Sequence, residues 1–486
     1  MSSVLWTVAL LATGSAKAAQ INVQPGDDVG GLTQSLRAGD VIIFQDGVHE
    51  ITDSLSWFEA IGTAEQPIEI KSALEAKPIL RLMEGSQILR IEASAHMHIS
   101  GLIFEGGAGW EEGGYSGIRI LNSSSITLDN IEVRQVQSTA LRIDGDCTGL
   151  SVTNSQLHTT FDGHGFEVGC GDAGCFVTDS VFSNNWIHDI GGESAGGLRL
   201  LHGSQGITVT GNIIHDIGDD GVYIGSAENG AVNVFSGNAI WAVVDDGLVI
   251  EGASRVHNNI IAQTGEYGIY LYNGDRDTLD DLAISHNTIV ETGLEGMRLN
   301  DIYARDSIRI ANNVVANPTG RGLRFDSAWD EYSAPSTAYL RNNVVSGLVE
   351  HLPEDMYEAG IIPGGGFADF EDAAMLDFYP SGESLVVNAG DASGESFVPE
   401  FDFNGLPREG DAPDAGAFEW DGLGNPAGAL VPGFKAPPTA TSGAARDVST
   451  GCCGKEKTEE GQGTQAAILL PLLLVAGLRR RRREDD

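Results

Sequence analysis

Three features of this 486-residue chain predict an all-β fold, namely a right-handed parallel β-helix built as a single solenoid of about ten coils. An asparagine followed by paired apolar residues recurs between residues 130 and 343, at intervals of 21 to 31 residues. A glycine followed by apolar–x–apolar falls between successive asparagines. Helical periodicity is almost absent, and the L-x-x-L-x-L spacing of leucine-rich repeats is missing. We therefore expect two or more strands per repeat, with alternate apolar side chains stacked inside the coils.

The asparagine phrase is expected to mark one turn of each coil. Examples are "NNWIHDI", "GNIIHDI" and "NNVVANP". Asparagines at equivalent turns can hydrogen-bond one another and the backbone, so we expect a stacked ladder. Its predicted members are Asn130, Asn154, Asn185, Asn212, Asn238, Asn259, Asn287, Asn313 and Asn343.

The glycine phrase is expected to mark a second turn of each coil. Examples are "GLRL", "GVYI" and "GLVI". We expect these glycines to supply backbone angles with positive φ, which other residues adopt only at a cost. They are Gly117, Gly165, Gly197, Gly221, Gly247, Gly268, Gly296 and Gly322.

Two stretches resemble known β-helix proteins of the pectin-lyase-like fold. "GDVIIFQDGVHEI" followed by "GTAEQPIEIKS" resembles the opening of the chondroitinase B and alginate lyase family. That resemblance implies a polysaccharide lyase in which a lysine base works with an arginine, yet no lysine lies between Lys77 and Lys435. "LVVNAGD" and "DFNGLPREGDAPDAGAFEW" resemble the closing segment of bacterial surface β-helix proteins. We accordingly assign residues 19–350 to the β-helix and residues 351–421 to its closing segment.

The N-terminal segment predicts export. An apolar stretch ends in an A-x-A pattern at residues 16–18, as in a secretory signal peptide, although no basic residue precedes it. We assign residues 1–18 to this signal. Two cysteines of the body, Cys170 and Cys175, can close the short "GDAG" loop as a disulfide, which would leave Cys147 over.

The C-terminal segment predicts a sorting tail. Residues 422–451, rich in Gly, Pro, Ala, Ser and Thr, form a predicted flexible linker to residues 452–486. The apolar run 466–478 reaches roughly 20 Å as a helix, short of the ~30 Å hydrocarbon core. Cysteine, short apolar run and arginine cluster in this order resemble the C-terminal sorting signals of myxobacterial-type surface proteins. The resemblance implies that Cys452 or Cys453 becomes a lipidated end, and an ordinary C-terminal membrane anchor is the alternative.

The net charge of −41 restricts the partners. Such a charge argues against nucleic acid and against anionic membranes, so membrane contact is expected only through the C-terminal anchor. It suits calcium-containing surroundings outside the cell. The expected partner is an extracellular polysaccharide, and the chain is expected to be a monomer at the cell surface or outer membrane, or secreted after processing.

A column of basic and aromatic residues is expected along one flank of the solenoid. When the coils are aligned on the glycine phrase, the outward residue two positions later is Arg119, Glu167, Arg199, Tyr223, Val249, Tyr270, Arg298 and Arg324. Arginine and tyrosine on an exposed strand suit carboxylates and sugar faces. Arg142, Tyr270, Arg298 and Arg324 are therefore the predicted substrate-binding residues. The alternative is a solvated polar face.

An acidic cluster is expected beside that column. The motifs "GDDG" and "VDDG" place Asp219 and Asp220 next to Asp245 and Asp246, with Glu266 beyond. Two carboxylates ~4.8 Å apart repel by roughly 3.5 kcal/mol at an effective dielectric constant of 20, so a buried cluster needs a cation or a proton. Calcium is the natural cation for oxygen ligands outside the cell, and a solvated acidic ridge is the alternative.

The stretch "FDGHGFEV" resembles two families only in part. Gly163-His164-Gly165 resembles the GHG motif of polygalacturonases, whose aspartate pair precedes the motif rather than following it as here. Phe161, Asp162 and His164 resemble the F-D-P-H motif of alginate epimerases, whose catalytic tyrosine is replaced here by Thr159. Neither resemblance supplies a complete catalytic set.

Two functions remain open from the sequence. The first is a calcium-assisted uronan lyase, or a related hydrolase or epimerase. Asp220 and Asp246 would hold the ion, Arg199 would be clamp or base, and His164 or Tyr223 would carry the proton. The second is a noncatalytic adhesin or structural rod. A further column of His158, His188 and His215 could bind zinc or form a plain surface ladder.

Overall fold

The computed structural model describes residues 18–31, 36–107, 109, 116–171, 175–225, 231–272, 281–300, 308–325, 339–352, 354–408, 412–431 and 434–435. The chain divides into two units, residues 1–441 and 442–486, and every described residue belongs to the first. The predicted signal peptide before residue 18 and the predicted tail with Cys452 and Cys453 lie outside these residues. Among the described residues, no helix is long and apolar enough to cross a membrane.

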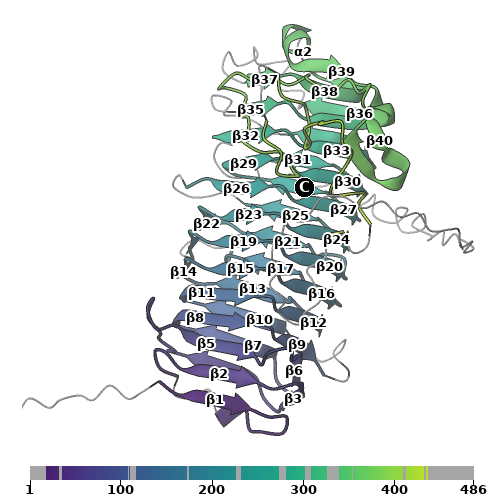
Figure 1. The fold of residues 1–486 in the computed structure, drawn as a ribbon. Helices are drawn as coiled ribbons and strands as arrows, with labels where there is room; N and C mark the ends of the chain where they lie inside the picture. Colours follow the sequence, from purple (N-terminus) through teal and green to yellow (C-terminus); the bar gives the residue numbers. More distant parts are fainter. Residues whose placement is uncertain are drawn as a thin grey trace, which may run out of the picture. The chain divides into compact units, whose positions relative to one another are not determined.

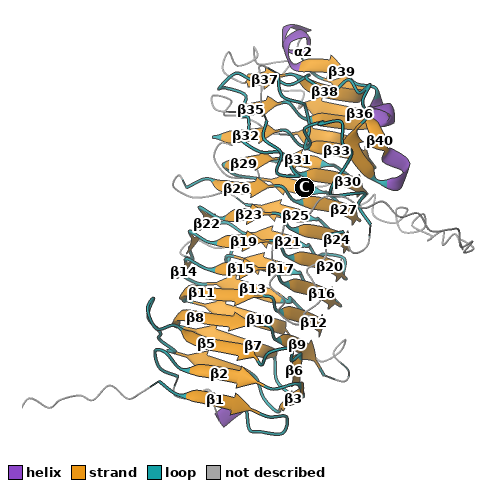
Figure 2. Ribbon diagram, viewed as in Figure 1, coloured by secondary structure: helices purple, strands orange, loops and turns teal. Residues whose placement is uncertain are grey.

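The described unit is a right-handed parallel β-helix, which confirms the predicted fold class (Figure 1). A typical coil consists of β23 (Thr208–Thr210), β24 (Ile213–Ile217) and β25 (Val222–Ile224). Each strand pairs in parallel with its equivalent one coil away, so the coils stack as three strand faces (Figure 2).

Face 1 carries the predicted glycine phrase. Its strands are β4 (Leu55–Phe58), β7 (Gln87–Glu92), β10 (Ser116–Leu121), β13 (Leu141–Asp144), β17 (Phe166–Val168), β21 (Leu198–Leu200), β25, β28 (Leu248–Ile250), β31 (Ile269–Leu271), β34 (Glu295–Leu299) and the second half of β36 (Val314–Phe325).

Face 2 follows the asparagine turns. Its strands are β3 (Gly47–Ile51), β6 (Pro78–Leu82), β9 (Ile103–Gly106), β12 (Glu132–Val136), β16 (Gln156–Thr160), β20 (Trp186–Ile190), β24, β27 (Ala239–Val243), β30 (Ile260–Thr264), β33 (Thr288–Thr292), the first half of β36, the first half of β38 (Asn343–Glu350) and β39 (Ile361–Pro363). The second half of β38 continues on face 1, where it pairs with the second half of β36.

Face 3 precedes the asparagine turns. Its strands are β1 (Gln20–Val23), β2 (Val41–Phe44), β5 (Ile68–Ser72), β8 (Ala95–Ser100), β11 (Ser124–Asp129), β15 (Ser151–Thr153), β19 (Val181–Ser183), β23, β26 (Asn233–Ser236), β29 (Ser254–His257), β32 (Leu282–Ser285), β35 (Ile308–Ala311) and β37 (Tyr339–Arg341). Short strands β14 (Cys147–Thr148), β18 (Val177–Thr178) and β22 (Ser204–Gln205) pair beside them.

The core is a continuous stack of aliphatic side chains inside the coils. Leu200, Ile224 and Ile250 occupy the same register position in successive coils, and each is at most 1% exposed. Each such residue contributes roughly 1.5–3 kcal/mol of burial free energy, and the parallel register repeats that gain in every coil. The core therefore fixes which residues of adjacent coils become neighbours on the surface.

The predicted asparagine ladder is present from Asn185 to Asn343. Asn212 Nδ2, for example, donates to Asn238 Oδ1 (3.0 Å), and Asn238 Nδ2 donates to Asn259 Oδ1 (3.0 Å). The inclusion of Asn130 and Asn154 was wrong. Both have positive φ (52° and 51°) and sit one position before the ladder. Ile131 and Ser155 occupy the ladder positions of those coils.

The explanation predicted for the glycine phrase was wrong. Gly117 and its equivalents do not have positive φ. Instead, there is no space for a side chain: a Cβ on Gly117 would lie 2.1 Å from the Ala140 carbonyl oxygen, and one on Gly296 would lie 2.2 Å from Val315 Cγ1. Glycine is required because the next coil and the core approach too closely for a methyl group.

The C-terminal part of the described chain covers face 2. This covering segment begins after α2 (Glu354–Gly360) and β39, and it comprises η2 (Gly366–Asp369), β40 (Phe370–Asp372), η3 (Ala373–Met375), β41 (Asp377–Pro380) and extended chain. Phe378, Phe403 and Phe418 belong to a second apolar cluster with outward residues of β24, β27 and β30. Leu430 and Phe434, which lie within the predicted linker, are buried in the same cluster.

Two cysteine predictions are confirmed. Cys170 and Cys175 form a disulfide, and Cys147 is a free, buried thiol. Burial raises the pKa of the Cys147 thiol to about 11, so the thiol stays protonated and unreactive near neutral pH.

Candidate functional site

Face 1 presents one outward side chain per coil in a single register, here called the central column. The predicted stacking is confirmed, with Arg142 filling the position between Arg119 and Glu167. Val249 is a gap in the column because it is only 6% exposed. The members in order are Arg119, Arg142, Glu167, Arg199, Tyr223, Val249, Tyr270, Arg298 and Arg324.

The lower arginines of the column are paired with buried carboxylates. Arg119 Nη2 and Arg142 Nε each lie 2.8 Å from Asp144 Oδ2, which is almost fully buried. Arg142 Nη1 also lies 3.3 Å from Glu167 Oε1. The adjacent guanidiniums offset the free-energy cost of burying these carboxylates. The column consequently carries less net positive charge than its arginines alone imply.

His164 belongs to this network. The Gly196 N–H donates to His164 Nδ1 (2.9 Å), while Nε2 lies 3.3 Å from Glu167 Oε2 and 2.9 Å from Arg199 Nη1. Burial, with the charges of Arg199 and Arg142, lowers the pKa of His164 to about 4. The ring is therefore neutral at neutral pH. Its Nδ1 accepts from the backbone, while its Nε2 lies between the Glu167 carboxylate, which can only accept, and the Arg199 guanidinium, which can only donate.

The upper end of the column contains a guanidinium cluster. Arg298, Arg321 and Arg324 each place Nη1 within 3.3–3.5 Å of Glu295 Oε1, and Glu295 is 2% exposed. Arg321 Nε also contacts Glu350 Oε2 (2.7 Å). Three partly exposed guanidiniums around one buried carboxylate leave positive charge at the surface, which suits an anionic ligand.

A tyrosine stack lies directly beside that cluster. The rings of Tyr267 and Tyr270 are 5.0 Å apart, and those of Tyr270 and Tyr272 are 5.7 Å apart. Asn300 Nδ2 donates to the Tyr270 hydroxyl (3.4 Å). Partly exposed aromatic rings next to polar groups can pack against the apolar face of a sugar.

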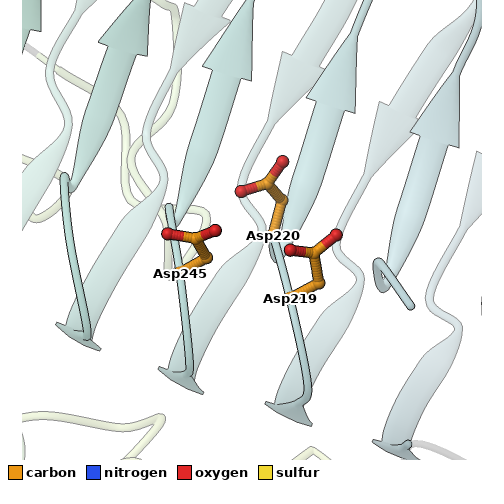
Figure 3. A group of neighbouring side chains, drawn as sticks. All are labelled: Asp219, Asp220 and Asp245. Atoms are coloured by element: carbon orange, nitrogen blue, oxygen red, sulfur yellow. The ribbon is translucent and has the colours of Figure 1, made fainter. Parts of the chain in front are cut away.

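The acidic cluster forms where the sequence predicts it. Asp219 and Asp220 lie in the turn between β24 and β25, and Asp245 and Asp246 in the equivalent turn one coil on. One carboxylate oxygen from each of Asp219, Asp220 and Asp245 lies within 4.8 Å of the others (Figure 3). Asp245, Asp246 and Glu266 make a second such group.

Asp246 is the buried centre of this cluster. Its N–H donates to Asp220 Oδ1 (3.2 Å), and its Oδ1 accepts from the Tyr267 N–H (3.0 Å). Asp246 is 1% exposed, and burial together with the charge of Asp220 raises its pKa to about 9. The carboxyl is thus held protonated at neutral pH unless a cation takes the place of the proton. The all-oxygen donor set fits calcium, which prefers hard carboxylate ligands.

The predicted histidine column is confirmed as a ladder on face 2. The rings of His158 and His188 stack 4.6 Å apart at 8°, and those of His188 and His215 stack 5.2 Å apart at 9°. Nδ1 of His188 and of His215 contacts the carboxylate of the following aspartate. Nearly parallel rings oriented in this way direct their Nε2 lone pairs side by side rather than toward one ion, so the geometry does not favour a zinc site.

Two residues of the site escaped the sequence analysis. The Tyr223 hydroxyl donates to Glu251 Oε2 (2.7 Å), and His202 Nε2 lies 3.4 Å from the same hydroxyl. Glu251 lies four residues after Gly247, two positions beyond the central column. Extending the glycine alignment by those two positions would have exposed Glu251, whereas His202 lies in a turn after β21 that no repeat marks.

Comparisons with known proteins place the fold. No curated protein matches the sequence significantly. The crystal structure of pectate lyase Pel9A aligns with a TM-score of 0.52 at 14% identity, covering 84% of this chain and 97% of that one. The A-module of the mannuronan C-5 epimerase AlgE4 from Azotobacter vinelandii aligns with a TM-score of 0.51 at 14% identity, covering 67% and 91%. At these identities the likeness shows the fold alone.

A family match agrees with this fold. The family described as "Right handed beta helix region" matches residues 116–288 and, overlapping them, 196–365. The two matches together span just over half of the chain. The stacked coils, the asparagine ladder and this match lead to one conclusion: the chain belongs to the right-handed β-helix family.

Proposed function

We propose that this chain is a cell-surface protein that binds acidic polysaccharide along face 1 and acts on it by calcium-assisted lyase chemistry. The observation that carries the proposal is the placement of the acidic cluster beside the central column. Asp220 precedes Tyr223 by three residues in one coil, and Asp246 lies one coil further on. A sugar carboxylate on this face would meet both carboxylates and guanidiniums.

Binding would rest on the upper half of face 1. Tyr270 offers a ring to a sugar face, while Arg298 and Arg324 offer guanidiniums to uronate carboxylates, and Arg142 extends the same column downward. The net charge of −41 would repel a polyanion elsewhere on the chain. The ligand would therefore be confined to this face.

Calcium would be held by Asp220 and Asp246, with Asp219, Asp245 and Glu266 completing the cluster. When bound, the ion supplies positive charge that neutralises a uronate carboxylate and makes its C5 proton more acidic. Arg199 lies on the same face, in the central column, and would clamp that carboxylate or take the C5 proton.

Tyr223 is the better proton carrier of the two candidates. Both ring nitrogens of His164 have partners, and its low pKa means that it carries no proton to donate as an imidazolium near neutral pH. In the proposed elimination, Arg199 takes the C5 proton, and the C5–H electron pair becomes the C4=C5 double bond as the C4–O4 bond breaks. The leaving oxygen takes the hydroxyl proton of Tyr223.

The test is turnover of alginate, pectate and chondroitin, followed by the ultraviolet absorbance of the unsaturated uronate. We expect product with calcium, none with a chelator, and a loss of about 10²–10⁴-fold in Tyr223→Phe. Arg199→Lys separates the two roles of Arg199, because lysine can act as a base but cannot clamp bidentately. Absence of product from every polymer, despite calcium, would exclude the lyase.

A noncatalytic adhesin is the second candidate. It is favoured by one observation, namely that the central-column arginines Arg119, Arg142 and Arg298 are paired with buried carboxylates, which suits stable binding more than proton abstraction. The adhesin predicts salt-sensitive retention of the polymer with no change in its length. Size-exclusion analysis of the recovered polymer decides between the two.

Export to the surface is part of the proposal. It is supported by the N-terminal apolar segment, the C-terminal cysteine–apolar–arginine order and the disulfide between Cys170 and Cys175, which is typical of oxidising compartments. Protease treatment of intact cells tests it. Digestion of the β-helix without lysis is expected, and full protection would contradict surface exposure.

A further inference from the structure

Tyr223 is part of a hydrogen-bonded group that extends beyond the central column. Its hydroxyl donates to Glu251 Oε2 (2.7 Å) and lies 3.4 Å from His202 Nε2. His202 Nε2 also lies 3.5 Å from Glu251 Oε2, and its ring stands at 88° to the tyrosine ring. The three side chains come from three successive coils of face 1, so the β-helix register holds them together.

The group is mostly screened from water. The side chain of Glu251 is 15% exposed and that of His202 is 14% exposed. A short hydrogen bond to a carboxylate is stronger than one between neutral groups, and low exposure strengthens it further. In the absence of a ligand, the Tyr223 hydroxyl therefore points to Glu251.

The same group is coupled to Arg199. The guanidinium carbon of Arg199 lies 5.4 Å from the centre of the Tyr223 ring, on the coil below. On its other side, Arg199 contacts His164 and Glu167. A chain of contacts thus runs from His164 through Arg199 and Tyr223 to Glu251.

We propose that Glu251 and His202 are positioning residues that orient the Tyr223 hydroxyl and allow it to release its proton. The inference rests on the proposed function, in which Tyr223 protonates the leaving oxygen. The hydroxyl must turn from Glu251 to the sugar, and the Nε2–H of His202 can then donate to the carboxylate in its place. After transfer, the phenolate oxygen can accept a hydrogen bond from the His202 Nε2–H, which lies 3.4 Å away, and it regains its proton from solvent.

A double-mutant cycle tests this role. The variants are Tyr223→Phe, Glu251→Gln and the double variant, with Glu291→Gln as control because Glu291 is exposed on face 2. We expect Glu251→Gln to lower kcat on the order of 10–100-fold with little change in KM. In the Tyr223→Phe background the same substitution should have no further effect, because it acts only through the hydroxyl. The control should leave kcat unchanged.

His202 is tested separately. His202→Phe keeps an aromatic ring and removes the proton donor, so kcat should fall while retention of the polymer is unchanged. Equal losses from Glu251→Gln with and without Tyr223 would show that Glu251 acts independently and would overturn the inference. A loss of polymer binding in step with kcat would do the same.

A spectroscopic readout separates this inference from the proposed function. The tyrosine doublet in ultraviolet resonance Raman spectra reports whether a phenol donates or accepts a hydrogen bond, and Tyr223→Phe supplies the difference spectrum. In the wild type, the doublet should show that the Tyr223 hydroxyl donates to a carboxylate. In Glu251→Gln, it should show a weaker donor. If the wild type lacks turnover, the proposed function fails while a changed doublet still supports the hydrogen-bonded group. An unchanged doublet would refute the group whatever the activity.

Discussion

Asp246 shows how one residue can link the scaffold to its chemistry. Burial and the neighbouring charge of Asp220 raise its pKa to about 9, far above the ordinary value for aspartate. The folded chain therefore binds a proton that the unfolded chain has already lost at neutral pH. Without a cation, the contribution of Asp246 to stability is fully present at low pH and is lost as pH rises from about 4 to about 9.

The stability of the chain should depend on pH through Asp246. In chelator, the free energy of unfolding should fall by up to about 1.4 kcal/mol per pH unit between pH 6 and pH 9. Asp246→Asn should remove most of this dependence, because an amide does not ionise. Denaturant titrations at several pH values measure both. An equal slope in the variant and the wild type would show that another group is responsible.

Glu295 holds a cluster of guanidiniums together. Its buried carboxylate is the shared partner of Arg298, Arg321 and Arg324. Glu295→Gln removes the carboxylate that the three guanidiniums share and leaves Glu350, which contacts Arg321 and Arg324, as the remaining counter-charge. The expected cost is about 1–3 kcal/mol, because the arginines remain partly solvated. Chemical denaturation measures the loss. Glu291→Gln is the matched control and should change stability by less than about 0.5 kcal/mol.

At the scale of one coil, the glycine phrase is a steric requirement. A Cβ on Gly221 would lie 2.7 Å from the Gly247 carbonyl oxygen and 2.7 Å from Ile240 Cγ2. Backbone cannot move aside without breaking the pairing of β25 with β28, so overpacking strain must follow. The glycine thus sets how closely adjacent coils approach.

Gly221→Ala should therefore lower the free energy of unfolding by about 1–3 kcal/mol or more. The informative control is Gly405→Ala. Gly405 has a positive φ of 82°, but an added methyl group would meet nothing within 4 Å, so only a conformational cost of about 1 kcal/mol is expected. Thermal unfolding of the two variants compares them. A smaller effect at Gly221 than at Gly405 would contradict the steric explanation.

The strands and their register were predictable because the repeat itself carries that information. Aligning glycines placed Tyr223 over Arg199 and Asp246 beside Asp220 correctly. The exact turn position of each asparagine was harder to predict from the sequence. Asn130 has the residue type of the ladder, but it adopts a left-handed conformation one residue before the ladder position. A repeating residue type does not reveal which of two adjacent turn positions it occupies.

The partners of the charged residues were beyond the sequence. The glycine alignment reaches the position of Glu251, but the contacts of Asp144 with Arg142 and of Glu251 with Tyr223 depend on side-chain direction and on burial. Whether a carboxylate is solvated or enclosed is decided by the neighbouring coils. For that reason, the predicted basic stripe turned out to be largely paired, whereas the acidic cluster turned out to contain a buried carboxyl, Asp246, whose pKa is raised to about 9.

At the scale of the whole described unit, the solenoid depends on its covering segment. The Arg408 side chain is fully buried, and its Nη1 donates to Glu419 Oε2 (2.8 Å). Its Nη2 donates to Asn258 Oδ1 (3.0 Å) in a turn of the solenoid. Arg408 therefore ties the covering segment to the coils.

Arg408→Met should cost about 3–5 kcal/mol, because Glu419 and several carbonyls lose their partner inside the protein. The variant should also bind a hydrophobic dye more strongly, since the apolar cluster on face 2 becomes accessible. Arg309→Met, on the outer side of face 3, is the control. Unchanged dye binding in Arg408→Met would show that the segment stays in place without this contact.

The net charge of −41 makes the whole chain sensitive to ions in two separable ways. Screening by sodium chloride should raise the melting temperature of any variant, because it weakens the repulsion among carboxylates spread over the surface. Binding of calcium at the acidic cluster should add an increment of about 2.7 kcal/mol when free calcium is 100 times its dissociation constant. At matched ionic strength, wild type should therefore be more stable in calcium chloride than in sodium chloride.

The Asp220→Asn/Asp246→Asn double variant should keep the stabilisation that comes from screening and lose the increment that comes from calcium. If both salts stabilise the wild type and the double variant equally, the cluster is an acidic ridge without a specific ion.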